Sequence, residues 1–127
     1  MTEDETPPAC IEASPRVAAY LQLVEISAAV SEGRLDGASA DALYDELEMY
    51  LRLEIDRFAD YPRFDWPAYT EGLARVREGL ETLLRVTRSS RLSGLDEGLQ
   101  AQAEQGSDAV VAGQALLVDA HTRAVEG

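Results

Sequence analysis

The sequence predicts an all-helical protein, an antiparallel bundle of four helices. Apolar residues recur at intervals of three and four over four separate stretches, as they do on one face of an α-helix. Glycine, proline and serine separate these stretches, and no segment alternates apolar and polar residues for long enough to predict a strand. Because short turns make neighbouring helices antiparallel, we expect helices at about residues 15–32, 39–61, 66–90 and 94–125.

The first of these helices should follow an acidic tail. Residues 1–13 contain two prolines and four acidic side chains, with too little apolar content to pack, so we expect a flexible tail there and a single helical domain over residues 14–127. Ser14 can cap the first helix, Pro15 suits its first position, and Gly33 should end it. Its expected buried stripe is Val17, Leu21, Val24 and Ala28.

The second helix has the clearest apolar periodicity. Ser39 can cap its first turn, and Pro62 should stop it. Its expected buried stripe is Leu43, Leu47, Tyr50, Leu51, Ile55 and Phe58.

The third helix should begin at a cap on Asp65, with Pro67 in its first turn and a stripe of Leu73, Val76, Leu80 and Leu83. The periodicity lapses around residues 89–94 and resumes through Leu95, Leu99, Ala103, Val110 and Leu117. Ser107 could cap a separate fifth helix, so one long final helix and two shorter ones both remain open.

The charge balance is strongly acidic, with 24 Asp and Glu against 11 arginines and a net charge of -13. This charge disfavours nucleic acid and anionic membranes, because phosphate contacts need cations. It favours a partner protein with a basic surface, although ordinary solubility explains the charge equally simply. The absence of Lys and Asn is typical of a GC-rich bacterial genome.

Several features predict a soluble, cytoplasmic protein. The acidic N-terminus lacks the basic and apolar regions of a secretory signal, and no apolar run is long enough to cross a bilayer. A single cysteine, Cys10, cannot form an internal disulfide, which agrees with a reducing compartment.

Glycines are placed unusually within two of the expected helices. Gly72 and Gly79 are seven residues apart in the third helix, and Gly106 and Gly113 are seven apart in the last. Because glycine inside a helix costs about 1 kcal/mol relative to alanine, such pairs indicate that another backbone approaches closely. The approach could be packing within the chain or self-association in a homodimer.

Five of the eight aromatic residues lie around the turn between the second and third helices, together with Arg63: Phe58, Tyr61, Phe64, Trp66 and Tyr69. Aromatic residues and arginine are common at the energetic centres of protein interfaces, so this turn is the best candidate for partner binding. The alternative is a satellite core that locks the two helices together. Both apply if Phe58 and Trp66 point inward while Tyr61 or Phe64 points outward.

The second helix also has a strongly acidic polar face, which could dock a basic partner. Its carboxylates are Asp41, Asp45, Glu46, Glu48, Glu54, Asp56 and Asp60. Alternatively, they pair with the arginines of the third helix: Arg75, Arg77, Arg85, Arg88 and Arg91.

No motif predicts catalysis. The only histidine, His121, lacks the glutamate three residues earlier that a di-iron bundle requires. Asp45-x-x-Glu48 and Glu78-x-x-Glu81 resemble, in spacing alone, the acidic pairs of all-helical nucleotide pyrophosphohydrolases, which would imply a magnesium site. Such pairs occur on any solvated helix, so we expect no enzyme, no metal and no cofactor.

The sequence therefore favours a protein–protein interaction module, such as a bacterial cytosolic adaptor, assembly factor or secretion-type chaperone. One alternative is a scaffold that self-associates through the glycine-bearing helices. The other is an acidic inhibitor, an immunity protein or DNA mimic. Salt would strongly weaken its binding to a basic partner.

Overall fold

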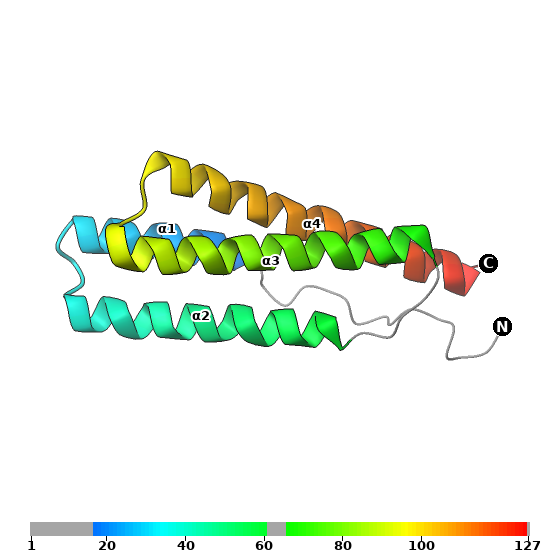
Figure 1. The fold of residues 1–127 in the computed structure, drawn as a ribbon, viewed down its shortest axis with the longest axis horizontal. Helices are drawn as coiled ribbons and strands as arrows, with labels where there is room; N and C mark the ends of the chain where they lie inside the picture. Colours follow the sequence, from blue (N-terminus) through cyan, green and yellow to red (C-terminus); the bar gives the residue numbers. More distant parts are fainter. Residues whose placement is uncertain (1–16, 61–65, 127) are drawn as a thin grey trace.

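The computed structural model describes residues 17–60 and 66–126, and these residues form four helices with no strand. They are α1 (Val17–Ser31), α2 (Gly37–Ala59), α3 (Pro67–Ser93) and α4 (Glu97–Glu126). Consecutive helices run in opposite directions, which confirms the predicted antiparallel bundle (Figure 1). The predicted tail over residues 1–13 and the expected roles of Ser14, Pro15, Pro62 and Asp65 lie outside the described residues.

The final helix is continuous, so the fifth helix that we left open is absent from residues 97–126. Ser107 is buried inside α4 instead of capping a new helix. The helix begins at Glu97 because Asp96 precedes it and accepts a hydrogen bond from the Leu99 N–H at 2.8 Å. The preceding helix, α3, continues to Ser93, three residues beyond the predicted end, and Gly94 follows it with a φ of 85°.

The start of α2 also differs from the prediction. Asp36, and not Ser39, is the cap residue, and its side chain accepts a hydrogen bond from the Ser39 N–H at 2.7 Å. The helix therefore begins at Gly37, two residues earlier than expected. Ser39 lies within the first turn and supplies the N–H that the cap satisfies.

The Asp36 cap gives α2 a pH-dependent contribution to stability. Hydrogen bonding from the Ser39 N–H lowers the pKa of Asp36 below its usual value of 3.8. Because the folded pKa is lowered, the stabilisation is complete above the unfolded pKa and is lost as pH falls through the folded pKa. We expect Asp36→Ala to lower the free energy of unfolding at neutral pH, by a difference that shrinks in acid. Urea unfolding over a pH series measures this difference.

The matched control for this prediction is Asp36→Asn, which keeps a capping oxygen but has no carboxyl to titrate. The free energy of unfolding of Asp36→Asn should exceed that of Asp36→Ala by the same amount throughout the acid range. If wild type and Asp36→Ala lose stability in parallel as the pH falls, the cap is not the source of the pH dependence.

The core lies between the four helices, but α1 and α2 face it differently from the prediction. In α1, Leu23 is completely buried, whereas the predicted core residue Leu21 is 61% exposed. In α2, Leu43 is 37% exposed, so the predicted stripe is wrong at that position. The buried face of α2 consists instead of Ala40, Tyr44, Leu47, Leu51, Glu54 and Phe58.

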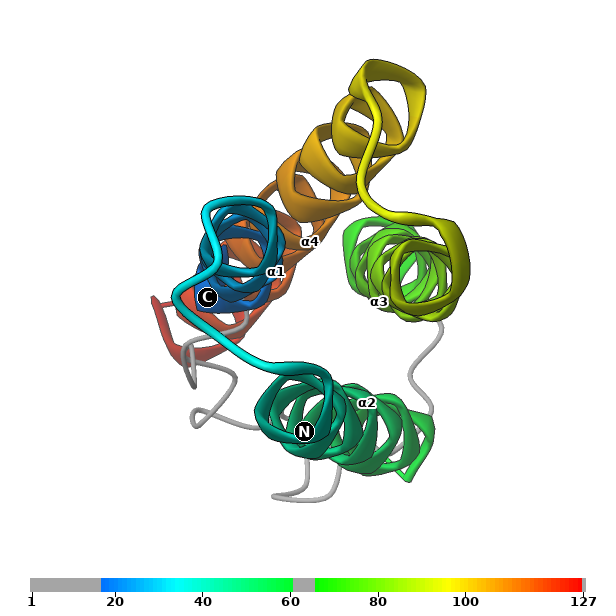
Figure 2. The ribbon, with the colours of Figure 1, turned by 90° about the vertical axis from the view of Figure 1, so that its left-hand side faces the viewer.

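The four glycines lie where α3 and α4 cross, within one chain. A Cβ atom on Gly72 would lie 2.9 Å from the carbonyl oxygen of Gly113, and one on Gly79 would collide with the carbonyl oxygen of Gly106. Figure 2 shows α3 and α4 side by side near their crossing, with α2 below α3 and α1 beside α4. The glycine faces are thus occupied by packing inside the bundle, and self-association through them would have to separate α3 from α4.

Candidate functional site

The described part of the aromatic turn belongs to the core. Phe58 is 4% exposed and Tyr69 is fully buried, which agrees with the satellite core that we had left open for this cluster and not with partner binding by these two residues. Both occupy inward positions of their helices, since they continue the buried stripes of α2 and α3. Trp66 is partly buried and packs against this core. Tyr61, Arg63 and Phe64 lie outside the described residues.

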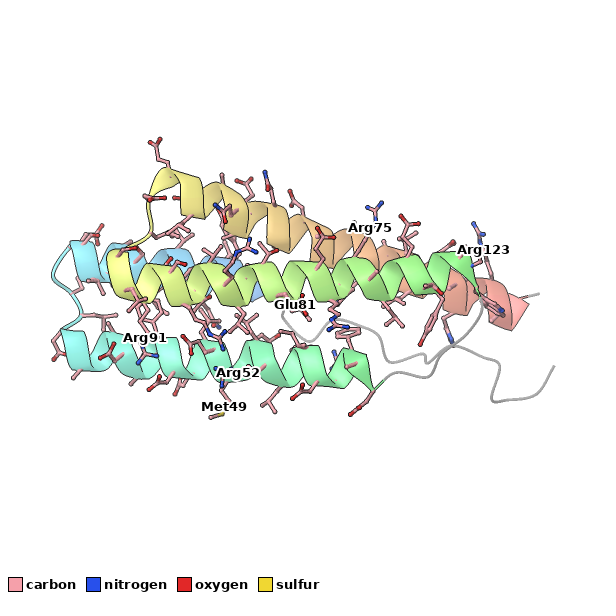
Figure 3. All side chains as sticks on the ribbon, in the orientation of Figure 1. Met49, Arg52, Arg75, Glu81, Arg91 and Arg123 are labelled. Atoms are coloured by element: carbon pink, nitrogen blue, oxygen red, sulfur yellow. The ribbon has the colours of Figure 1, made fainter. Side chains whose placement is uncertain are left out.

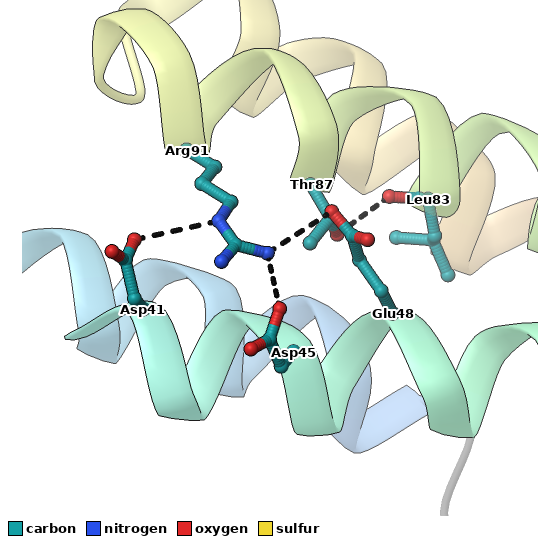
Figure 4. Close-up of polar contacts among 6 residues, drawn as sticks. All are labelled: Asp41, Asp45, Glu48, Leu83, Thr87 and Arg91. Atoms are coloured by element: carbon teal, nitrogen blue, oxygen red, sulfur yellow. Dashed lines mark hydrogen bonds and ion pairs between the residues drawn. The ribbon is translucent and has the colours of Figure 1, made fainter. Parts of the chain in front are cut away.

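Arg91 of α3 gathers three carboxylates of α2, as the close-up shows (Figure 4). Its guanidinium lies 2.5 Å from Asp45, 3.4 Å from Asp41 and 3.8 Å from Glu48. The hydrogen bond to Asp45 is the main reason that the pKa of Arg91 is raised above its usual value. The predicted site residues Asp45 and Glu48 therefore take part in contacts between helices, although the side chain of Asp45 remains 66% exposed.

Glu54, another of the carboxylates that we expected to be available to a basic partner, is buried instead. It is 8% exposed, and its carboxylate accepts a hydrogen bond from Arg57 at 3.0 Å. Arg57 also lies over the ring of Phe58, with its guanidinium carbon 4.8 Å from the ring centre. Both residues of this pair belong to α2, and because Glu54 is buried, it does not contribute to an external acidic surface.

An apolar pair with acidic neighbours lies on the outward side of α2. Met49 is 63% exposed and Leu53 is 61% exposed. We call the helix face that they share the outer stripe. Its members recur at spacings of three and four residues: Glu46, Met49, Leu53, Asp56 and Asp60. Within the described part of the chain, the three carboxylates of this stripe form no salt bridge. Figure 3 shows Met49 directed away from α3.

A groove of about 630 Å³ separates α1 from α2 and borders the outer stripe. Its apolar lining consists of Ile26, Ala29, Leu35, Leu43, Leu47 and Tyr50. Its polar lining consists of Gln22, Glu25, Arg34 and Glu46. Because Glu46 belongs to both features, the groove and the outer stripe form one continuous surface. The acidic part of this surface was expected from the carboxylates of the second helix, whereas its apolar part was missed, since Leu43 had been assigned to the core and Met49 and Leu53 had not been considered.

The acidic pairs with pyrophosphohydrolase-like spacing do not come together. Asp45 and Glu48 face Arg91, while Glu81 pairs with Arg77 at 3.0 Å and lines, with Glu78, a groove against α4. Among the described side chains, no three His, Cys, Asp or Glu residues are grouped so that they could hold a metal ion.

The fold and this surface define the class of the protein, a four-helix bundle with an acidic and apolar face on α2. No protein-family model matches the sequence, and no curated protein or solved structure matches it. Within residues 17–60 and 66–126, none of the helices has the length and apolar character needed to cross a membrane.

Proposed function

We propose that the protein is a non-enzymatic protein–protein interaction module, a bacterial cytosolic adaptor, assembly factor or secretion-type chaperone. It binds a partner with a basic surface through the outer stripe of α2. The observation that carries the proposal is the exposure of Met49 and Leu53 one helical turn apart, framed by carboxylates that no described arginine neutralises.

The composition of the outer stripe suits this role. Burying a side chain such as methionine or leucine contributes roughly 1.5–3 kcal/mol, and flexible methionine adapts to partners of different shape. The flanking carboxylates speed association with a basic surface and repel acidic competitors. Apolar anchors with a charged rim are the usual anatomy of a protein interface.

The experiment compares partner capture by wild type and by a Met49→Ser, Leu53→Ser double variant, each used as the full chain. The matched control is Val111→Ser with Val118→Ser, because these α4 valines are also exposed, at 47% and 44%. We expect wild type and the control to retain one defined protein from native lysate, and the α2 variant to lose it. Light scattering should report a monomer before capture.

Three outcomes would count against the adaptor. Equal capture by all three proteins would remove the outer stripe from the interface. Complete loss of capture by wild type at moderate salt would favour an acidic inhibitor, because charge alone would then hold the partner. A dimer at every concentration that captures nothing would favour a self-associating scaffold.

One observation favours the scaffold as a second candidate. The ten residues from Ala109 to Val118 in α4 carry no charge, although Val111, Ala115 and Val118 are exposed on one face. A helix without charge on its outer face commonly packs against another element. Self-association would then use this outer face of α4 and not the glycine face, which α3 already covers.

A further inference from the structure

The α1–α2 groove has the dimensions of a short helix-binding site. Its lining extends from Gln22 to Ala29 on α1 and from Leu43 to Tyr50 on α2, a rise of seven residue steps along each helix. At 1.5 Å per residue, each wall is about 10 Å long, which equals two turns of an α-helix. A partner helix lying along the groove could therefore place apolar side chains at positions i, i+3 or i+4, and i+7 into it.

We propose that this groove binds the apolar face of a basic amphipathic helix that belongs to a partner protein. The proposal rests on the proposed function, because it identifies the kind of segment that the acidic face of α2 would recognise. Ile26 and Leu47 form the buried floor, and the partly exposed Leu43 provides an apolar edge that an incoming side chain would cover.

The charge of the rim favours a basic occupant. Glu25 on α1 and Glu46 on α2 are both exposed and lie on opposite walls of the groove. Among the lining residues that the structure describes, Arg34 is the only cation, and it pairs with Glu32 at 2.7 Å instead of with these two carboxylates. Lysine or arginine residues on both flanks of an apolar helix face would then meet one carboxylate on each wall.

The same charge argues against two other occupants. A second copy of this chain would bring a net charge of -13 toward an acidic rim. A small apolar molecule would leave the exposed carboxylates without partners, and ligand pockets normally enclose most of their ligand. A basic helix satisfies both the floor and the rim.

The test uses the full chain and a defined probe, an 18-residue fluorescent peptide of leucine and lysine with its leucines at helical spacing. Two control peptides have the same length. One contains the same residues with the leucines scattered around the helix, and the other has glutamate in place of lysine. Fluorescence anisotropy measures each dissociation constant at moderate salt. We expect the first peptide to bind and both controls to bind at least tenfold more weakly.

The variants locate the binding site. Leu43→Gln should weaken binding roughly tenfold, the effect of losing about 1.4 kcal/mol of apolar contact. Val111→Gln on α4 is its matched control and should change the affinity less than twofold. The charge reversals Glu25→Arg and Glu46→Arg should also weaken binding. Their matched control is Glu104→Arg on α4, which should change the affinity less than twofold. Thermal unfolding checks that each variant is folded. Amide chemical shifts should change at residues 22–29 and 43–50.

The outcomes separate this proposal from the proposed function. Equal binding of the scattered peptide, or no effect of Leu43→Gln, would overturn the helix-binding groove. If Met49→Gln with Leu53→Gln still weakened binding in that case, the outer stripe would remain the interaction surface. If neither change altered binding, both proposals would fail. A dimer that Leu43→Gln converts to a monomer would show that a second copy occupies the groove, which also overturns the proposal.

Discussion

Gly79→Ala is expected to lower the free energy of unfolding by about 3 kcal/mol, the upper part of the usual range for overpacking. The added Cβ would collide with the carbonyl oxygen of Gly106 and would lie 2.6 Å from Cγ2 and 2.8 Å from the amide nitrogen of Val110. Two of these three neighbours are backbone atoms, which cannot rotate away as a side chain does. The helices must therefore separate, and the loss far exceeds the gain of about 1 kcal/mol in helix propensity.

The other glycines at this crossing should form a graded series. At Gly113 the nearest atom would be 2.6 Å away, at Gly72 2.9 Å and at Gly106 3.0 Å, so destabilisation should decrease in that order. Near Gly106 two of the contacts come from the Thr82 side chain, at 3.1 and 3.2 Å, and small shifts can relieve them. Urea unfolding followed by far-ultraviolet circular dichroism measures each change.

Gly37→Ala is the matched control for the series. Gly37 begins α2, and no atom lies within 4 Å of its added Cβ. Alanine there should be neutral or should stabilise by up to about 1 kcal/mol, because it restricts the unfolded chain. If Gly79→Ala costs no more than Gly106→Ala, α3 and α4 do not approach as closely as the structure places them. A change in solution mass in Gly79→Ala would instead link the glycine face to self-association.

The existence of four helices could be predicted because local signals agree with the periodicity. Gly33 has a φ of 74° just after α1, a conformation that few residues other than glycine adopt, and Pro67 opens α3. The seven-residue glycine spacing likewise indicated a close approach of backbones. Sequence alone could not decide between a helix of the same chain and one of a second chain, because the spacing describes only one side of the contact.

The orientation of α1 could not be predicted, and the reason is its composition. The helix Val17–Ser31 carries a single charged residue, Glu25, so its sequence defines no polar face. Leu21 and Leu23 were equivalent candidates for the core, and packing against the other helices decides between them. The α1–α2 groove therefore could not be predicted either, because it depends on which side of α1 faces α2.

In α2 the difficulty was a conflict between periodicity and charge. Glu54 continues the spacing of Leu47, Leu51 and Phe58 and is buried with them, but its charge suggested the polar face. The converse holds for Met49 and Leu53, whose apolar character hid an outward position. The two signals disagree at the apolar members of the candidate surface, Met49 and Leu53, so the sequence favoured the aromatic turn as the site of partner binding instead.

Arg57→Met should lower the free energy of unfolding by about 2 kcal/mol. Breaking a buried ion pair from one side typically costs about 3–5 kcal/mol, and we reduce this figure because the Arg57 side chain is 36% exposed. The loss arises because Glu54, 8% exposed, would keep its charge while losing the guanidinium group that lies 3.0 Å from it. Urea unfolding at neutral pH measures the change, and Arg52→Met, at an exposed position of the same helix, should be nearly neutral.

A double substitution separates the ion pair from simple packing. Replacing Glu54 with leucine in the Arg57→Met background removes the buried charge and extends the apolar face of α2, so it should restore most of the lost stability. Such recovery would show that Glu54 imposes a cost which Arg57 offsets, and that the ion pair adds no net stability. If the double variant is less stable than Arg57→Met, the carboxylate itself contributes through its hydrogen bonds. In that case Glu54 would be a stabilising member of the core.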